Sequence, residues 1–203
     1  MDDIIERAKK YNEQFNKYPP LVWTTEPRVW IYGYWIIGNY YKNKSSYYGT
    51  YPHSYLKRIK SMFGDIPTWN TLHLFAGEVD TAEFPGTTFD INPELKPDIV
   101  GDAHNLTDVL QKHQNIYQNK TWELIIADPP YSDEDATHYG TPMVNRNKVV
   151  KECTKLLCKG GYLVWLDQVS PMFRKDELER IGSIGLERST NHRVRSVFIW
   201  RKR

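Results

Sequence analysis

The sequence has few cysteines, no long apolar run and almost no net charge. Its two cysteines, Cys153 and Cys158, lie five positions apart in 203 residues. This pair forms neither a disulfide framework nor a metal-ligand pattern, so we expect two idle thiols in a reducing cytosol. A membrane-spanning helix needs roughly 20 apolar residues, and no stretch approaches that length. We therefore expect a soluble, cytoplasmic protein without a membrane partner.

The charge balance is also uninformative, because a net charge of +2 and a pI near 8.4 do not by themselves indicate a nucleic-acid binder. The distribution says more, since Glu187 is the only acid among residues 187–203. The cations of this segment are Arg188, Arg193, Arg195, Arg201, Lys202 and Arg203. We interpret the last three as a solvated tail. Arg193 and Arg195, near the rim of the predicted sheet, are our candidates for phosphate contacts.

Aromatic residues are concentrated near the N-terminus, where nine of the 14 tyrosines fall between residues 18 and 55. Two interpretations stay open for this block: an aromatic lid packed on the core, or a cover for a cofactor with a surface for stacking bases. Apolar spacing predicts helices over residues 2–17 and 53–64, the second ending at Gly64. Residues 21–52 show no clean period, and we expect irregular structure with short strands.

After Pro67, short apolar runs alternate with turns, which is typical of successive βα units. The predicted strands are residues 72–75, 87–90, 98–100, 122–127 and 162–166. The predicted helices are residues 105–118, 145–159 (ending at Gly160-Gly161) and 173–181. Residues 186–189 and 195–200 predict a terminal antiparallel hairpin. We therefore predict one α/β domain over residues 67–203, with a mostly parallel sheet and a terminal antiparallel strand. An N-terminal helical and aromatic extension, residues 1–66, packs on this core.

Polar residues follow four of the predicted strands. The residues at or just after these strand ends are Gly77, Asp90, Asp102 and Asp128. In a parallel sheet the carboxyl ends of the strands bring such residues to one edge of the sheet. A glycine turn allows close approach of the backbone, and Asp90 suits the two hydroxyls of a ribose. Asp102 and the Ala103 N–H suit the amino group and a ring nitrogen of adenine.

The stretch 127-ADPPYS-132 is the most unusual of these strand ends. Proline cannot donate to a sheet ladder, so Pro129 and Pro130 must end the strand and stiffen the chain that leaves it. Asp128 is thereby held beside whatever the neighbouring strand ends bind.

These motifs, in this order, resemble those of class I S-adenosylmethionine-dependent methyltransferases. The motifs are FAG at 75–77, FDIN at 89–92, GDAHNL at 101–106 and ADPPYS at 127–132. The last one is similar to the DPPY motif of the amino-methylating branch, which includes DNA adenine methylases. The resemblance covers residues 70–167 and implies a single Rossmann-like methyltransferase domain with S-adenosylmethionine as its cofactor. The implied cofactor-binding residues are Phe75, Ala76, Gly77, Asp90, Ile91, Asp102 and Ala103, with Tyr48 and Pro52 from the segment 47-YYGTYP-52.

The resemblance also implies a mechanism. Asp128 and the Pro129 carbonyl accept the hydrogens of an exocyclic base amine, Pro130 stiffens this pair, and Tyr131 stacks on a base that has left the duplex. No metal is required, and no His/Cys/Asp cluster has ligand spacing. The predicted function is methylation of a base amine in nucleic acid, with adenine in DNA favoured over RNA. Two alternatives stay open: an RNA base amino-methyltransferase, for example on guanine of ribosomal RNA, and a non-catalytic nucleic-acid-binding module with a degraded methyltransferase fold.

The sequence departs from the family pattern in two ways. Gly77 lacks a second glycine, and Asp90 follows after only 13 residues, which leaves no room for a full crossover helix. Glu78 or Asp80 then supplies part of the contacts to the methionine end of the cofactor, or the aromatic block closes over it. The chain also has no separate target-recognition region, so recognition comes from the aromatic block and residues 132–147, or from a homodimer or another partner.

Overall fold

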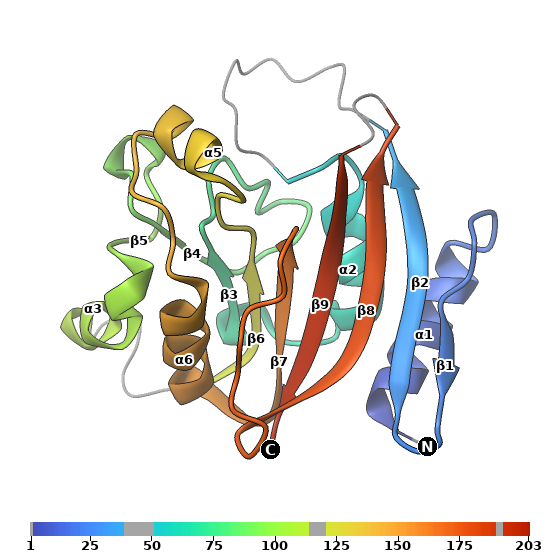
Figure 1. The fold of residues 1–203 in the computed structure, drawn as a ribbon. Helices are drawn as coiled ribbons and strands as arrows, with labels where there is room; N and C mark the ends of the chain where they lie inside the picture. The colour runs from blue at the N-terminus through green and yellow to red at the C-terminus, as the bar shows by residue number, and fades with distance from the viewer. Residues whose placement is uncertain (1, 39–50, 114–120, 190–192) are drawn as a thin grey trace.

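The computed structural model describes residues 2–38, 51–113, 121–189 and 193–203. Within these residues, nine strands form one sheet in the order β1-β2-β8-β9-β7-β6-β3-β4-β5. Strands β1 and β9 run opposite to the other seven (Figure 1). The predicted α/β fold, with a mostly parallel sheet and a terminal antiparallel strand, is confirmed.

The parallel strands of the predicted βα units are β3 (Thr71–Leu74), β4 (Thr87–Asp90), β5 (Ile99–Val100, at the edge of the sheet), β6 (Trp122–Ala127) and β7 (Leu157–Asp167). Strands β6 and β7 carry near-continuous buried apolar runs, at residues 124–127 and 162–166, as expected for parallel strands that are covered on both faces. The chain between β3 and β4 contains no helix, as its length predicts. All five strands end at the same edge of the sheet, so the polar residues that follow them lie close together.

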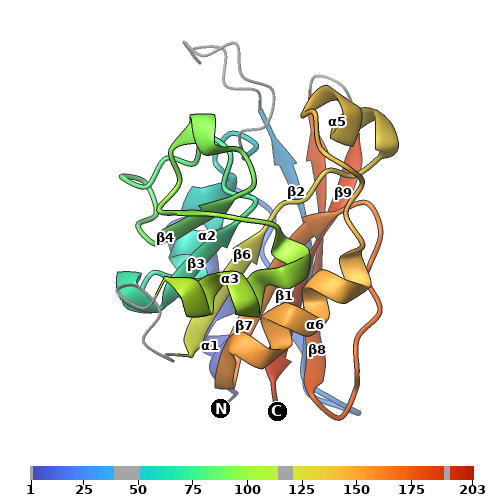
Figure 2. The same ribbon diagram turned by 90° about the vertical axis from the view of Figure 1, so that its left-hand side faces the viewer.

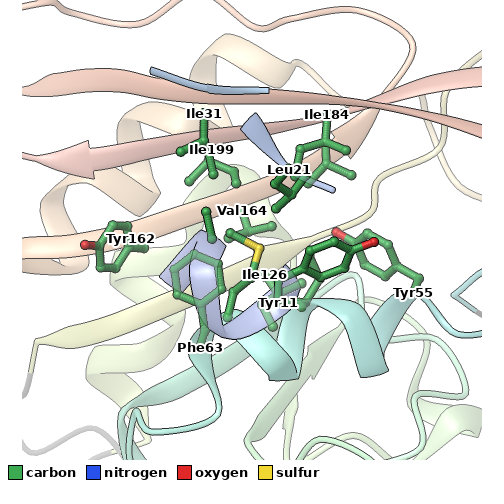
Figure 3. Packing of buried hydrophobic residues seen from close by; sticks show 14 of the residues in the cluster. Tyr11, Leu21, Ile31, Tyr55, Phe63, Ile126, Tyr162, Val164, Ile184 and Ile199 are labelled. Carbon is green, nitrogen blue, oxygen red and sulfur yellow. The ribbon is translucent and has the colours of Figure 1, made fainter. Parts of the chain in front are cut away.

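Two apolar layers cover the faces of this sheet. Helices α1 (Asp3–Gln14) and α2 (Tyr55–Phe63) pack on one face, where Tyr11, Phe63 and Ile126 belong to one cluster (Figure 3). Helices α3 (Leu106–Lys112) and α6 (Arg146–Leu156) pack on the other face. Figure 2, which looks from the β5 edge, shows α2 and α6 on opposite sides of the strands. No described helix is long and apolar enough to cross a membrane.

The N-terminal segment corrects one expectation. Residues 21–52 were expected to be irregular with short strands, and residues 39–50 of this range lie outside the described residues. The described part contains the short strand β1 (Val22–Thr24) and a longer regular strand, β2 (Trp30–Ile37), and both extend the sheet. Strand β2 pairs with β8 in parallel over seven residues, from Ile31 to Ile37. Strand β2 forms because it pairs with β8, which is distant in the sequence. The local spacing of apolar residues could therefore not predict it.

The C-terminal half corrects two further expectations. The predicted helix over residues 173–181 is absent, because Phe173 packs on Trp200 and β8 (Leu178–Arg188) begins within that range. The helix predicted over 145–159 ends at Leu156 as α6, and Gly160-Gly161 lies inside β7. The predicted hairpin is confirmed, since β8 pairs antiparallel with β9 (Val194–Lys202).

The two cysteines occupy different elements. Cys153 is buried in α6 and Cys158 is half-buried in β7, so the expectation of one shared helical stretch is wrong for Cys158. Burial raises the pKa of both thiols, which lowers their thiolate content and their reactivity.

Candidate active site

A cavity of about 360 Å³ opens at the carboxyl ends of β3, β4, β5 and β6. This volume lies within the range of small-molecule sites in proteins. Among the predicted site residues, those that line the cavity are Pro52, Phe75, Gly77, Asp90, Ile91, Asp102, Ala103, Asp128, Pro129, Pro130, Tyr131, Arg193 and Arg195. Ala76 is buried and does not line the cavity. Tyr48 lies outside the described residues.

The turn after β3 is held by Asp90. Phe75 and Gly77 both have positive φ values, 59° and 53°, so the backbone reverses sharply at the cavity floor. The Gly77 N–H donates to Asp90 Oδ2 at 2.9 Å, and the Asn92 N–H donates to Asp90 Oδ1 at 2.9 Å. A carboxylate has about four acceptor positions, so each Asp90 oxygen keeps capacity for a ligand hydroxyl.

The carboxylate of Asp102 is oriented by a histidine. His104 Nε2 accepts from the Asn145 N–H at 2.8 Å, which places the ring proton on Nδ1. Nδ1 then donates to Asp102 Oδ1 at 2.7 Å, and the same oxygen accepts from the His104 N–H at 2.9 Å. Asp102 therefore points one oxygen into its own turn and leaves the other for a ligand. His104 lies two residues after Asp102 in the sequence, but only the fold brings Asn145 to it.

Asp128 follows the last residue of β6 and is half-buried in the cavity wall. Burial raises the pKa of this carboxyl to about 7, and the nearby Arg195 opposes the rise. The Tyr131 hydroxyl donates to Asp128 Oδ1. This acid is therefore poised to change its charge near neutral pH, which is a common property of groups that take part in catalysis.

The two candidate phosphate ligands lie against the ring of Tyr131. The guanidinium carbons of Arg195 and Arg193 lie 4.6 Å and 5.4 Å from the ring centroid. Arg195 is buried, and Arg193 forms a two-pronged ion pair with Asp135, at 2.8 Å and 3.2 Å. Both arginines thus hold the Tyr131 ring in the wall of the cavity.

A buried ion pair supports the ADPPYS turn from below. Arg146, the first residue of α6, donates from Nε to Asp167 Oδ2 at 2.6 Å and from Nη2 to the Tyr131 carbonyl at 2.8 Å. Asp167 ends β7 and is fully buried. The turn is thereby tied to two other elements, through residues that no sequence motif indicates.

Tyr51 is the functional candidate that the sequence prediction missed. It lines the cavity beside Pro52, and its ring stacks on Tyr55 at 5.3 Å. The hydroxyls of both tyrosines are buried without a hydrogen-bond partner among the described residues. Burial raises the pKa of Tyr51 well above its usual value, and the carboxylates of Asp128 and Asp90 raise it further. A buried donor without a partner, close to both acids, is suited to a ligand that bridges them.

No family model and no curated protein matches this chain. Among solved structures it is similar to TrmN from Thermus thermophilus, with 13% identity, a TM-score of 0.50 and coverage of 73% of this chain and 48% of TrmN. This chain thus spans about half the length of TrmN. The N-methyltransferase NodS from Bradyrhizobium japonicum in complex with SAH has 12% identity, 74% and 85% coverage and a TM-score of 0.45. An rRNA methylase from Streptococcus thermophilus has 11% identity, 68% and 89% coverage and a TM-score of 0.44. The likeness to TrmN and the strand order together confirm the predicted Rossmann-like methyltransferase fold.

Proposed function

We propose that this chain binds S-adenosylmethionine and methylates the exocyclic amino group of a base in nucleic acid, with adenine in DNA as the substrate. The observation that carries the proposal is the meeting of Gly77, Asp90, Asp102 and Asp128 in one cavity at the carboxyl ends of parallel strands. The proposal also draws on the order of the motifs in the sequence.

The residues present fit the cofactor. Asp90 has acceptor capacity left for the ribose hydroxyls, Asp102 has a second oxygen for the adenine amino group, and Tyr51 offers a hydroxyl without a partner. When bound, S-adenosylmethionine supplies an electrophilic methyl group. Pro52 and Phe75 add apolar surface to the cavity wall.

The chemistry of this chain lies in the acceptors at the end of β6. A base amine is a poor nucleophile because its lone pair is delocalised into the ring. Ionised Asp128 and the Pro129 carbonyl each accept one of its hydrogens, which favours a tetrahedral, more nucleophilic nitrogen. Pro130 and the tie from Arg146 to the Tyr131 carbonyl keep this acceptor pair in place. Tyr131, held by Arg195, offers the ring face on which the base stacks.

Two measurements test the proposal. Calorimetry with S-adenosylmethionine should show binding, and Asp90→Ala should weaken it at least about tenfold. Labelled cofactor incubated with duplex DNA, single-stranded DNA and RNA should label adenine in DNA, while Asp128→Ala keeps the cofactor affinity and loses most turnover. Label in RNA alone would assign the RNA alternative. If no cofactor binds, the non-catalytic nucleic-acid-binding module is the alternative that survives. Full turnover by Asp128→Ala would show that Asp128 is not an acceptor for the base amine.

A further inference from the structure

Arg195 is a buried cation in the wall of the cavity, near the start of β9. It is 7% exposed, and pairing with Leu186 on β8 fixes its backbone. Its Nε has no hydrogen-bond partner, and no carboxylate forms an ion pair with it in the described part of the chain. A buried charge without a paired carboxylate costs stability, so its presence indicates a task in the site.

The other arginines around the ADPPYS turn already have carboxylate partners. Arg193 pairs with Asp135, and Arg146 pairs with Asp167. The other basic side chains of the cavity lining each interact with another group of the protein: His53, His104 and Arg188. Arg195 therefore differs from its neighbours in that its charge is not matched by a carboxylate of its own.

Tyr131 connects Arg195 to Asp128. The guanidinium carbon of Arg195 lies 4.6 Å from the centroid of the Tyr131 ring, and the Tyr131 hydroxyl donates to Asp128 Oδ1. A cation is attracted to the face of an aromatic ring, and within such a chain of contacts it polarises the hydroxyl towards its acceptor. Burial raises the pKa of Asp128, and the charge of Arg195 and the hydrogen bond from Tyr131 oppose this rise.

The other groups that face Asp128 do not favour its ionisation. The carboxylates of Asp167 on β7 and Asp135 on α5 raise its pKa further, in addition to the larger effect of burial. Tyr51 and Tyr55 face it from the side of α2, and burial raises the pKa of both hydroxyls well above the usual value. They are therefore neutral and bring no positive charge. Among the described residues, the strongest support for an ionised carboxylate thus comes from β9.

We propose that Arg195 is a positioning residue of the candidate active site, which acts directly and through Tyr131 to keep Asp128 ionised for the acceptance of a base amine. This inference rests on the proposed function, in which the ionised carboxylate is the acceptor. It gives Arg195 a role other than the phosphate contact expected from the sequence. A buried guanidinium that already lies on a ring presents little surface to an exposed phosphate.

A titration of the Asp128 carboxyl by carbon-13 NMR tests this charge effect without any substrate. The signal is assigned by its loss in Asp128→Asn, and its midpoint in the wild type should lie at about pH 7. Arg195→Met keeps an unbranched side chain and removes the charge, so it should raise this midpoint by at least about one pH unit. Arg195→Lys keeps the charge, so its midpoint should stay close to that of the wild type.

Arg180 on β8 provides a matched control. Its guanidinium carbon also lies 4.6 Å from a ring centroid, that of Phe198, and its Nε also has no partner among the described residues. It lies near the amino end of β8, outside the cavity lining. Arg180→Met should therefore leave the midpoint of the Asp128 carboxyl unchanged.

The pH dependence of turnover, measured with labelled cofactor and DNA, tests the consequence. If the midpoint rises from about 7 to about 8, the ionised fraction at pH 7 falls from about one half to about one tenth. Arg195→Met should then lose turnover about fivefold at pH 7 and approach the wild-type rate above about pH 9.5. A merely structural defect would lower turnover by the same factor at every pH.

Three results would refute the proposal. They are an unchanged Asp128 midpoint in Arg195→Met, a raised midpoint in Arg195→Lys, and a raised midpoint in Arg195→Met without a matching shift of its turnover profile. If Arg195→Met does not fold, the neutral but polar variant Arg195→Gln replaces it in the same titration. If the wild type methylates no nucleic acid, the proposed function fails, and the NMR titration still decides whether Arg195 controls the charge of Asp128.

Discussion

The ionised form of Asp128, which the proposed function needs, is also the form that lowers the stability of the folded protein. Its pKa of about 7 in the folded protein lies well above the ordinary value of 3.8. The folded protein therefore holds this proton more tightly than the unfolded chain, and ionisation costs stability. This cost begins above pH 4 and is complete above pH 7. The proposed acceptor role needs the ionised form, so turnover should rise with pH through about 7.

Asp128→Asn should therefore stabilise the protein at alkaline pH while it abolishes turnover. The asparagine oxygen can still accept from Tyr131, and no charge is buried. The free energy of unfolding should increase by about 2–4 kcal/mol at pH 8.5 and change little at pH 4, measured by urea titration. Asp135→Asn is the control with the opposite sign, because Arg193 holds the pKa of Asp135 below its usual value. Equal effects of Asp128→Asn at both pH values would contradict the assigned pKa.

Tyr51 and Tyr55 provide a matched pair for a second prediction. Both hydroxyls are buried without partners among the described residues, but only Tyr51 lines the cavity. Replacing either residue by phenylalanine keeps the stacked rings and removes an unsatisfied donor, so each variant should gain about 1 kcal/mol in unfolding free energy. Only Tyr51→Phe should also weaken cofactor binding in calorimetry, by roughly tenfold. Unchanged affinity in Tyr51→Phe would show that its hydroxyl does not contact the ligand.

At the scale of the elements, helix α6 supports the ADPPYS turn in addition to covering one face of the sheet. Its first residue, Arg146, ties the end of β7 to the ADPPYS turn through Asp167 and the Tyr131 carbonyl. Removing one partner of a buried ion pair leaves an uncompensated charge. Asp167 keeps donors from Trp165 Nε1 and the Gln168 N–H, which limits the loss.

Arg146→Met should lower the unfolding free energy by about 3 kcal/mol and should also reduce turnover, because the acceptor pair loses its support. Urea unfolding and a methylation assay measure the two effects. Arg174→Met is the control, since its ion pair with Asp176 is exposed and its loss should leave the free energy of unfolding nearly unchanged. A loss of stability with normal turnover would restrict Arg146 to a structural role.

The elements that the sequence predicted correctly are those whose signal is local. Strand β6 has the predicted bounds, because its buried run is closed by two prolines. Strand β2 and the start of β8 were missed, since their strand structure depends on pairing between residues 31–37 and 182–188. The apolar spacing around Phe173 resembles a helix, but that side chain packs against Trp200 from an extended chain. The domain boundary placed after residue 66 stays a prediction.

At the scale of the whole molecule, the sequence predicted those parts of the site that belong to short contiguous motifs. The carboxyl ends of parallel strands lie at one edge of the sheet. The motifs alone therefore predict that Asp90, Asp102 and Asp128 lie close together. Contacts between distant segments could not be predicted in this way. One example is the hydrogen bond from Asn145 that orients His104. Another is the position of Tyr51 near Asp128 and Asp90, because no local feature of the sequence distinguishes it from the other tyrosines of the aromatic block.

Because the cavity lies at the ends of four strands of one sheet, a bound ligand should stabilise the whole fold. A ligand at 100 times its Kd contributes about 2.7 kcal/mol, which raises Tm by about 5–10 °C in a chain of this size. Thermal unfolding with S-adenosylmethionine should show this rise in the wild type. The rise should fall by at least about half in Asp90→Ala at the same ligand concentration, because a tenfold weaker affinity leaves about 1.4 kcal/mol of stabilisation. This variant removes the acceptor that also holds Gly77 and Asn92. Asp108→Ala, on α3 and outside the cavity lining, is the control and should keep the full rise. An equal shift in Asp90→Ala would place the ligand elsewhere in the molecule.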